Sequence, residues 1–156
     1  MTAAVSLPYD AENTSRSQDA ARIALGLMLA FAGTSHLTFA RDAFKAQVPD
    51  WVPLDTDTVV LESGVVEILM GGALIFLPAH KKLVGCIAGA FFTAVFPGNI
   101  SQYVNRRSAF GLDTDRKRFV RLFFQPVLVA WALWSTGALG CRDKTRILRP
   151  GKTMLK

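Results

Sequence analysis

The sequence predicts an all-α membrane protein, an antiparallel four-helix bundle whose helices run up-down-up-down. The chain has 156 residues, enough for one domain, and 51% of them are hydrophobic while only 19% are charged. Its mean hydropathy of +0.28 exceeds that of ordinary soluble domains. The apolar residues gather in four blocks, each close to the roughly 17 to 25 residues that a membrane-spanning helix needs.

The four blocks define the expected spans and the domain boundaries. A transmembrane domain is expected over residues 22–140, with a polar mobile amino tail over 1–21 and a basic carboxyl tail over 141–156. Within this domain, the expected spans cover about residues 23–39, 58–77, 83–100 and 119–139.

Two alternative interpretations of the apolar blocks are disfavoured. A soluble four-helix bundle should carry a polar stripe along each helix, and "LVGCIAGAFFTAVF" (residues 83–96) has none. A cleaved signal peptide should begin with a basic region, whereas Asp10, Glu12 and Asp19 precede the first block. The first block is therefore retained as a helix.

Proline and glycine support the span boundaries. Pro78 follows the second block and opens the short basic turn "PAHKK", so the second and third blocks form a tight antiparallel hairpin.

Gly85 and Gly89 form a small-xxx-small pair, which serves either close packing within one bundle or a homo-oligomer interface.

The distribution of Lys and Arg predicts the orientation. Ten of them lie in the tails and the second loop, and seven lie in the first and third loops, which places both termini in the cytoplasm of a bacterial-type plasma membrane. The net charge of +6 then reflects topology and contact with anionic lipid. Nucleic-acid binding is disfavoured, because the basic residues flank spans and build no separate domain.

The two cysteines indicate neither a redox couple nor a metal site. Cys86 lies within the third block and Cys141 lies just beyond the fourth, with no CxxC pair. No metal site is predicted.

Polar residues inside the blocks converge at one end of the expected bundle. Antiparallel spans with a rise of about 1.5 Å per residue bring them all to the side of the first and third loops. Only Arg22, at a boundary, falls elsewhere. The converging residues are His36, Glu62, Ser63, Glu67, Asn99, Gln102, Arg121 and Gln125. We therefore expect one buried polar site.

The expected roles follow from residue chemistry. Charges inside a bilayer face the bundle interior and pair, so Glu67 and Arg121 are expected to form an ion pair, with either a catalytic or a purely structural role. His36 is the expected proton-exchanging neighbour. Ser63, Asn99 and Gln125 are expected to bind a ligand through hydrogen bonds.

The second acid of the second block has a different expected position. Glu62 and Glu67 are five residues apart and thus about 140° apart around a helix, so they are not expected to share a role. Glu62 either contributes to ligand binding or meets water at the interface.

Four motifs resemble the successive signatures of the DoxX-like family of small four-helix membrane proteins. They are "AGTSHLTF", "SGVVEILMGGALIFLP", "AVFPGNISQYV" and "RLFFQPVLVAWALW", within residues 22–140. The family's motifs coincide here with His36, Glu67, Asn99, Arg121 and Gln125. Gly98 stands where alanine is more common.

The resemblance implies an accessory of a membrane redox system, an oxidoreductase-associated subunit that acts on a quinone or a sulfur species beside a membrane or soluble redox partner. The implied cofactor is a quinone, since the sequence has no flavin, haem, iron–sulfur or metal motif. A non-enzymatic membrane scaffold is the alternative, and a small-solute transporter is a third.

The first loop is expected to fold over the open end of the site. The segment "FKAQVPDWVP" (residues 44–53) alternates apolar residues with prolines, and Trp51 lies where an aromatic interface anchor is expected. Lid and lipid anchor remain alternative roles for it.

Overall fold

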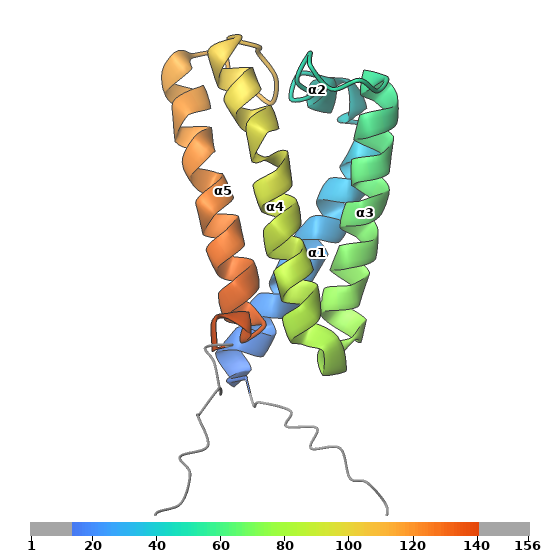
Figure 1. Cartoon of the computed structure of the whole chain (residues 1–156), viewed down its shortest axis with the longest axis vertical. Helices are drawn as coiled ribbons and strands as arrows, with labels where there is room; N and C mark the ends of the chain where they lie inside the picture. Colours follow the sequence, from blue (N-terminus) through green and yellow to red (C-terminus); the bar gives the residue numbers. More distant parts are fainter. Residues whose placement is uncertain (1–13, 141–156) are drawn as a thin grey trace, which may run out of the picture.

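The computed structural model describes residues 14–140, and this part of the chain is all-helical (Figure 1). The all-α prediction is confirmed. The described residues form five α-helices and two short 3-10 turns, at Pro78–His80 and Ala138–Gly140. The α-helices are α1 (Arg16–Leu37), α2 (Arg41–Lys45), α3 (Thr56–Phe76), α4 (Lys81–Val104) and α5 (Asp115–Ser135).

Three helices of the described chain are long and apolar enough to cross a membrane. They are α1, α3 and the stretch Pro78–Val104 that contains α4. Five of the first seven residues of α5 are charged, which lowers its apolar content. The structure thus shows an all-helical chain with three helices that could cross a membrane, whereas the predicted fourth span stays a prediction. α2 is an additional short helix between α1 and α3.

The helix boundaries differ from the expected spans mainly at the amino end. Ser15 caps α1 through a capping box with Gln18, so residues 16–21, expected in the amino tail, are helical. α4 continues through Pro97 to Val104. The rest of the expected amino tail, residues 1–13, and the carboxyl tail, residues 141–156 with Cys141, lie outside the described residues.

The long helices pack as two antiparallel pairs. In the first pair, Arg22 near the start of α1 donates to the carbonyl of Leu74 near the end of α3. At the opposite end of that pair, His36 of α1 reaches Ser63 of α3. In the second pair, Asn99 late in α4 meets Gln125 early in α5.

Two hydrogen bonds join the pairs where α1 begins and α5 ends. The indole Nε1 of Trp131 donates to the carbonyl of Ala21 at 2.9 Å, and the amide of Gln18 donates to the carbonyl of Trp134 at 2.8 Å. Both chain ends of the described part therefore lie at the same end of the molecule (Figure 1).

Glycines allow α1 and α3 to approach closely at two levels. A Cβ on Gly33 would lie 2.4 Å from the carbonyl oxygen of Gly64, and a Cβ on Gly71 would lie 2.5 Å from that of Gly26. The spacing of seven residues in each helix puts both glycines on one face. We call these two contacts the glycine seam.

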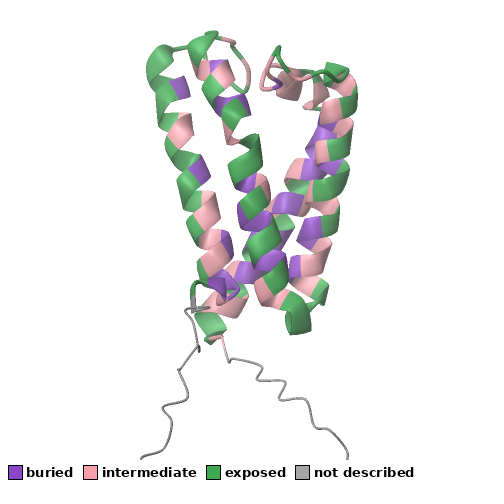
Figure 2. Ribbon diagram, viewed as in Figure 1, coloured by how far each residue is buried: buried purple, intermediate pink, exposed green. Residues whose placement is uncertain are grey.

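The hydrophobic core fills the end of the bundle at which the two pairs meet. Buried residues face inward, and the outer faces are exposed (Figure 2). Towards the end that carries α2, the two pairs lean apart (Figure 1). The core cluster contains Leu25, Leu29, Met70, Leu74, Val84, Ala88, Phe92 and Ala132.

The glycine seam predicts opposite outcomes for two neighbouring substitutions. Gly71→Ala places a methyl group against the backbone of Gly26 and Ala30, and this overpacking should lower the free energy of unfolding by about 1 to 3 kcal/mol. The matched control is Gly72→Ala, whose Cβ would meet nothing within 4 Å. It should leave stability unchanged or slightly raised. Thermal unfolding in detergent measures both, and equal melting temperatures would contradict the seam.

Candidate functional site

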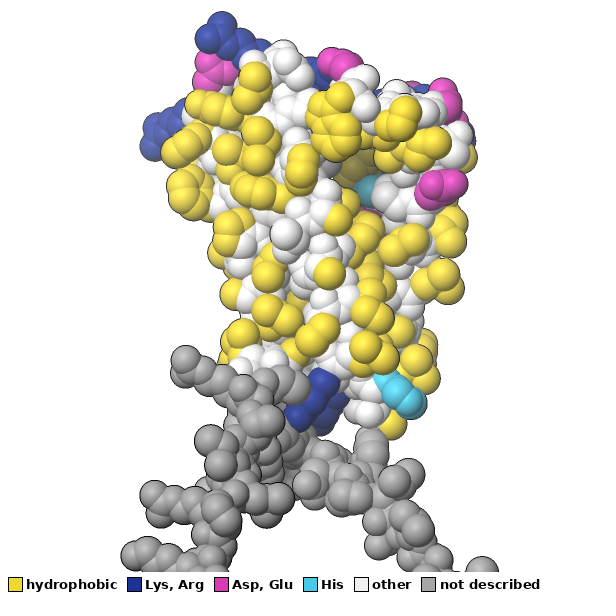
Figure 3. Space-filling model, viewed as in Figure 1, with side chains coloured by type: hydrophobic (Ala, Val, Ile, Leu, Met, Phe, Trp, Pro, Cys, Tyr) yellow, Lys and Arg dark blue, Asp and Glu magenta, His cyan; other side chains and the backbone are white. Residues whose placement is uncertain are grey.

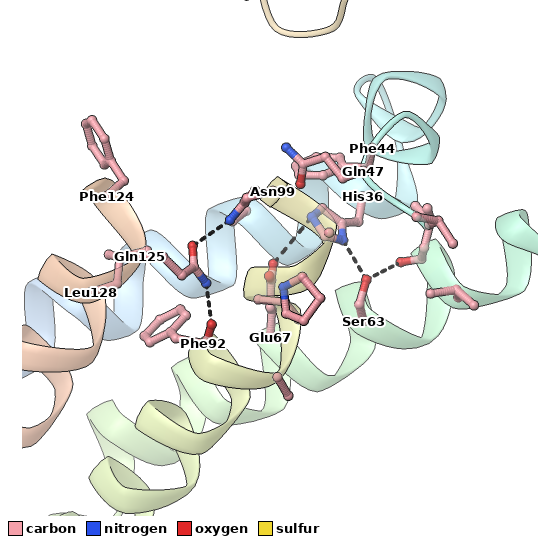
Figure 4. Close-up of a pocket in the computed structure, with 18 of the residues that line it drawn as sticks. His36, Phe44, Gln47, Ser63, Glu67, Phe92, Asn99, Phe124, Gln125 and Leu128 are labelled. Carbon is pink, nitrogen blue, oxygen red and sulfur yellow. Dashed lines mark hydrogen bonds and ion pairs between the residues drawn. The ribbon is translucent and has the colours of Figure 1, made fainter. Parts of the chain in front are cut away.

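A cavity of about 580 Å³ lies where the helix pairs diverge. Residues of all five α-helices and of the segment after α2 line it, and most of them are apolar. Three of the lining side chains are ionisable: His36, Glu67 and Arg121. The other strongly polar lining residues are Gln47, Ser63, Asn99 and Gln125 (Figure 4).

His36 is held between α1 and α3. Its Nδ1 lies 3.0 Å from Ser63 Oγ, and that hydroxyl donates to the carbonyl of Val60 at 2.9 Å. The ring of Phe44 on α2 packs against the imidazole with a centroid distance of 3.4 Å. The side chain is only 8% exposed, so the residues packed around it hold it in place.

Glu67 faces His36, with Oε2 3.7 Å from the imidazole Nε2 (Figure 4). This oxygen is buried and makes no hydrogen bond to any described residue. The α1–α3 contact brings the two side chains together from adjacent helices.

The expected ion pair between Glu67 and Arg121 is not formed within the described chain. Arg121 makes neither a hydrogen bond nor an ion pair there, and its guanidinium lies 5.9 Å from the centroid of the Phe124 ring on its own helix. The prediction was wrong because α5 belongs to the helix pair that leans away from α3. The two side chains line the same cavity and attract each other without direct contact.

Asn99 and Gln125 form a buried amide pair between α4 and α5. The Nδ2 of Asn99 donates to Gln125 Oε1 at 2.9 Å, and Gln125 Nε2 donates to the carbonyl of Phe92 at 2.6 Å (Figure 4). Both side chains are almost fully buried. The pair holds the two amides in fixed orientations at the cavity wall.

The cavity brings together six of the eight polar residues that were expected to converge, and the buried Gln102 does not line it. Glu62, which was also a candidate for ligand binding, is exposed and does not line the cavity, because its position about 140° from Glu67 around α3 turns it outward. The six lining residues are His36, Ser63, Glu67, Asn99, Arg121 and Gln125. Their roles in catalysis or ligand binding remain predictions.

The sequence argument missed Phe44 and Gln47, which also line the cavity. Both belong to the segment that was expected to cover the site, but a loop has no helical period that would single out its inward side chains.

The segment after α2 covers the divergent end of the cavity. Gln47, Val48, Pro49, Trp51 and Val52 line the cavity, in agreement with the expected covering position, although Trp51 is 72% exposed. A Cβ on Gly98 would lie 2.5 Å from the carbonyl oxygen of Gln47. The unusual glycine in the third motif therefore allows this segment to approach α4.

The α4–α5 loop fastens this segment in place. Arg107 donates to the carbonyl of Val48 at 2.9 Å and to Asp50 Oδ1 at 2.5 Å, and Gln47 Nε2 donates to Gln102 Oε1 at 3.3 Å. We call the segment 46–55, which these contacts hold in place, the cap.

Ion pairs join α2 to α3, the two helices that flank the segment 46–55, and a further one lies at the start of α5. Arg41 and Lys45 of α2 both bind Asp57 at the start of α3, and hydrogen bonds to Asp42 and Asp57 raise the pKa of Lys45. In the first turn of α5, the buried Arg118 binds Asp115 of the same helix at 2.7 Å and Ser108 Oγ of the α4–α5 loop at 3.0 Å. The basic character of this loop therefore has a structural use.

A family model described as "Domain of unknown function (DUF8561)" matches residues 25–136, more than half of the chain. The chain therefore belongs to this family. No curated protein and no solved structure matches it. The match covers every expected site residue, but it does not test the DoxX resemblance, which remains a prediction.

The cap predicts a local effect of Arg107→Ala. The substitution removes two hydrogen bonds, each contributing about 1 kcal/mol, so the backbone amides of Val48 and Val52 should exchange with solvent roughly tenfold faster or more. Hydrogen exchange read by mass spectrometry measures this. Arg106→Ala is the control, because Arg106 is largely exposed and makes no contact with the cap. Equal exchange in the two variants would show that Arg107 does not fasten the cap.

Proposed function

We propose that this member of the DUF8561 family is an integral membrane protein that binds a small amphipathic ligand in its interhelical cavity. The observation that carries the proposal is the lining of the cavity. The cavity has a volume of about 580 Å³, its wall is mainly apolar, and a few polar side chains point into it. Small-molecule sites typically have this composition, with apolar surface for affinity and a few polar groups for orientation.

The proposal includes four membrane spans in up-down-up-down order, with α5 as the fourth. α5 packs antiparallel to α4, and its outer face exposes Phe119, Phe123 and Val127, which suits contact with acyl chains. Its inner charges have protein surroundings: Arg118 is bonded within the loop, and Arg121 faces the cavity. The Lys and Arg distribution then favours both termini in the cytoplasm.

The polar residues divide the work of recognition. Asn99 and Gln125 present a fixed amide surface from one helix pair, whereas His36 and Glu67 present the ionisable groups from the other. A ligand seated between the pairs would contact both, and the cap would shield it from water.

The redox role implied by the DoxX resemblance is a more specific version of this proposal. A quinone has an apolar body and a head that exchanges protons, which suits a cavity with His36 and Glu67. No observation in the structure favours a quinone over other amphiphiles. A non-enzymatic scaffold is the competing proposal, and it predicts that the cavity stays empty.

Filling the cavity should abolish ligand binding. Ala32 lines the cavity, so Ala32→Phe should remove the mass of any small molecule that the wild-type protein retains after purification in mild detergent. Ala130→Phe adds the same ring to the exposed face of α5, outside the cavity, and should retain the ligand. Native mass spectrometry measures both. Wild-type protein that carries no small molecule and binds no added amphiphile would favour the scaffold.

The fourth span predicts which positions are accessible from each side of the membrane. In a background that carries both Cys86→Ser and Cys141→Ser, Asp50→Cys and Asp113→Cys should react with a membrane-impermeant thiol reagent on one side. His80→Cys and Leu139→Cys, at the other end of the helices, should react on the opposite side. Labelling of residue 139 from the same side as residue 113 would show that α5 does not cross.

A further inference from the structure

The opening of the cavity indicates how a ligand would reach it. In the side view, the molecule is hollowed beneath the loops, on the flank of the helices, and hydrophobic side chains surround the hollow (Figure 3). A histidine side chain is visible inside it, and His36 is the histidine that lines the cavity. In a membrane, this flank faces lipid, so the ligand would enter sideways from the bilayer.

The depth of the lining residues matches the orientation of a lipid-like molecule. His36 and Arg121 lie towards the capped end of α1 and α5, whereas Leu29 and Trp131 lie deeper along the same helices. Arg121 and Trp131 are ten residues apart, about 15 Å along a helix. An amphiphile in the leaflet on the capped side would place its polar head at the level of His36 and Arg121 and its apolar chain at the deeper level of Leu29 and Trp131.

The hydrogen bonds of His36 determine where its protons are. Ser63 Oγ lies 2.9 Å from the Val60 carbonyl and 3.0 Å from the imidazole Nδ1; when its single proton is donated to Val60, the hydroxyl accepts from the Nδ1–H. In the neutral ring Nε2 then carries a lone pair, and it faces the unbonded Oε2 of Glu67 at 3.7 Å. Two facing acceptors repel each other in a buried site.

One additional proton on this pair removes the repulsion. It resides on the carboxyl group, which leaves both groups neutral, or on the imidazole, which makes the two charges opposite. With this set of hydrogen bonds, His36 and Glu67 together contribute no net charge to the cavity.

Arg121 then has no counter-ion in direct contact, and the side chain that attracts it when ionised is Glu67. Its guanidinium is always charged, it is the third and last ionisable group among the lining residues, and it has no ion pair within residues 14–140. The lining thus carries one excess positive charge in apolar surroundings, where an unpaired charge is costly. A ligand with one negative charge would offset it.

From these observations, we infer that the ligand is a single-chain lipophilic carboxylate, which enters from the bilayer and is bound by Arg121 through its head. The planar guanidinium matches a carboxylate with two parallel hydrogen bonds. The Asn99 amide and the His36–Glu67 pair border the head, and the apolar wall holds the chain. This inference rests on the proposed function, since it specifies the class of amphiphile that the cavity binds.

The test compares probes that differ only in the head. The full-length protein in nanodiscs is titrated with palmitate, hexadecanol and hexadecylamine, and binding is followed by the fluorescence of the tryptophans, two of which, Trp51 and Trp131, line the cavity. Palmitate should bind at least about tenfold more tightly than hexadecanol, because only the acid pairs with Arg121. The amine should bind most weakly.

Variants then locate the charge contact. Arg121→Gln should remove the preference for palmitate over hexadecanol and leave the affinity for hexadecanol within about twofold, since the apolar wall is unchanged. Arg116→Gln is the matched control on the same helix, because Arg116 does not line this cavity. A preference that survives in Arg121→Gln would overturn the inference.

The outcomes separate this inference from the proposed function. Equal binding of palmitate and hexadecanol by the wild-type protein would overturn the carboxylate and leave amphiphile binding intact. Tighter binding of phosphatidylglycerol than of palmitate would likewise overturn a single-chain ligand. Failure of every probe to bind would overturn the proposed function, and the inference with it. The wild-type comparison remains decisive even if Arg121→Gln does not fold.

Discussion

The glycine seam between α1 and α3 is the contact on which the arrangement of the site depends. It lets the backbones approach until the carbonyls of Gly26 and Gly64 occupy space that a side chain would fill. The same approach places the Cβ of His36 against Gly64, where a Cβ on residue 64 would lie only 2.7 Å away. The short distance between the helices is what lets His36 reach Ser63 and face Glu67. Small residues at helix contacts have this effect in membranes generally, where dispersion and close approach replace the hydrophobic effect between helices.

The cavity exists because the second helix pair follows a different constraint. α4 and α5 are joined by the buried amides of Asn99 and Gln125, and the core and the bonds from Trp131 and Gln18 tie them to α1 at one end only. Towards the other end, the buried Val48 and Val60 lie outside the core cluster and line the cavity instead. The cap spans that end, and Arg107 connects it to the α4–α5 loop. The core cluster closes one end of the bundle and the cap closes the other, and between them lies the mainly apolar cavity with polar side chains from both helix pairs.

The charge distribution in this chamber gives the site its chemical character. A fully paired set of charges would be consistent with a purely structural role. The described chain instead pairs Glu67 with His36 and leaves Arg121 facing the cavity with an aromatic ring as its neighbour. A guanidinium without a contacting counter-ion is unfavourable in apolar surroundings, and this is the feature on which the proposed ligand site depends.

The sequence by itself determined the helical class, the approximate ranges of the long helices and the end at which the polar residues gather, because hydrophobic block length and alternating helix direction fix depth along the helix axes. Depth placed His36, Glu67, Asn99, Arg121 and Gln125 at one level, and helix phase separated Glu62 from Glu67. Only the tertiary structure decided the partners. Depth does not determine lateral distance, so it could not show that α5 leans away from α3, that Glu67 meets His36 rather than Arg121, or that Gln47 lines the cavity. Those contacts depend on how closely the helices of each pair approach one another. Glycines, buried amides and loops that lie far apart in the chain together determine that distance.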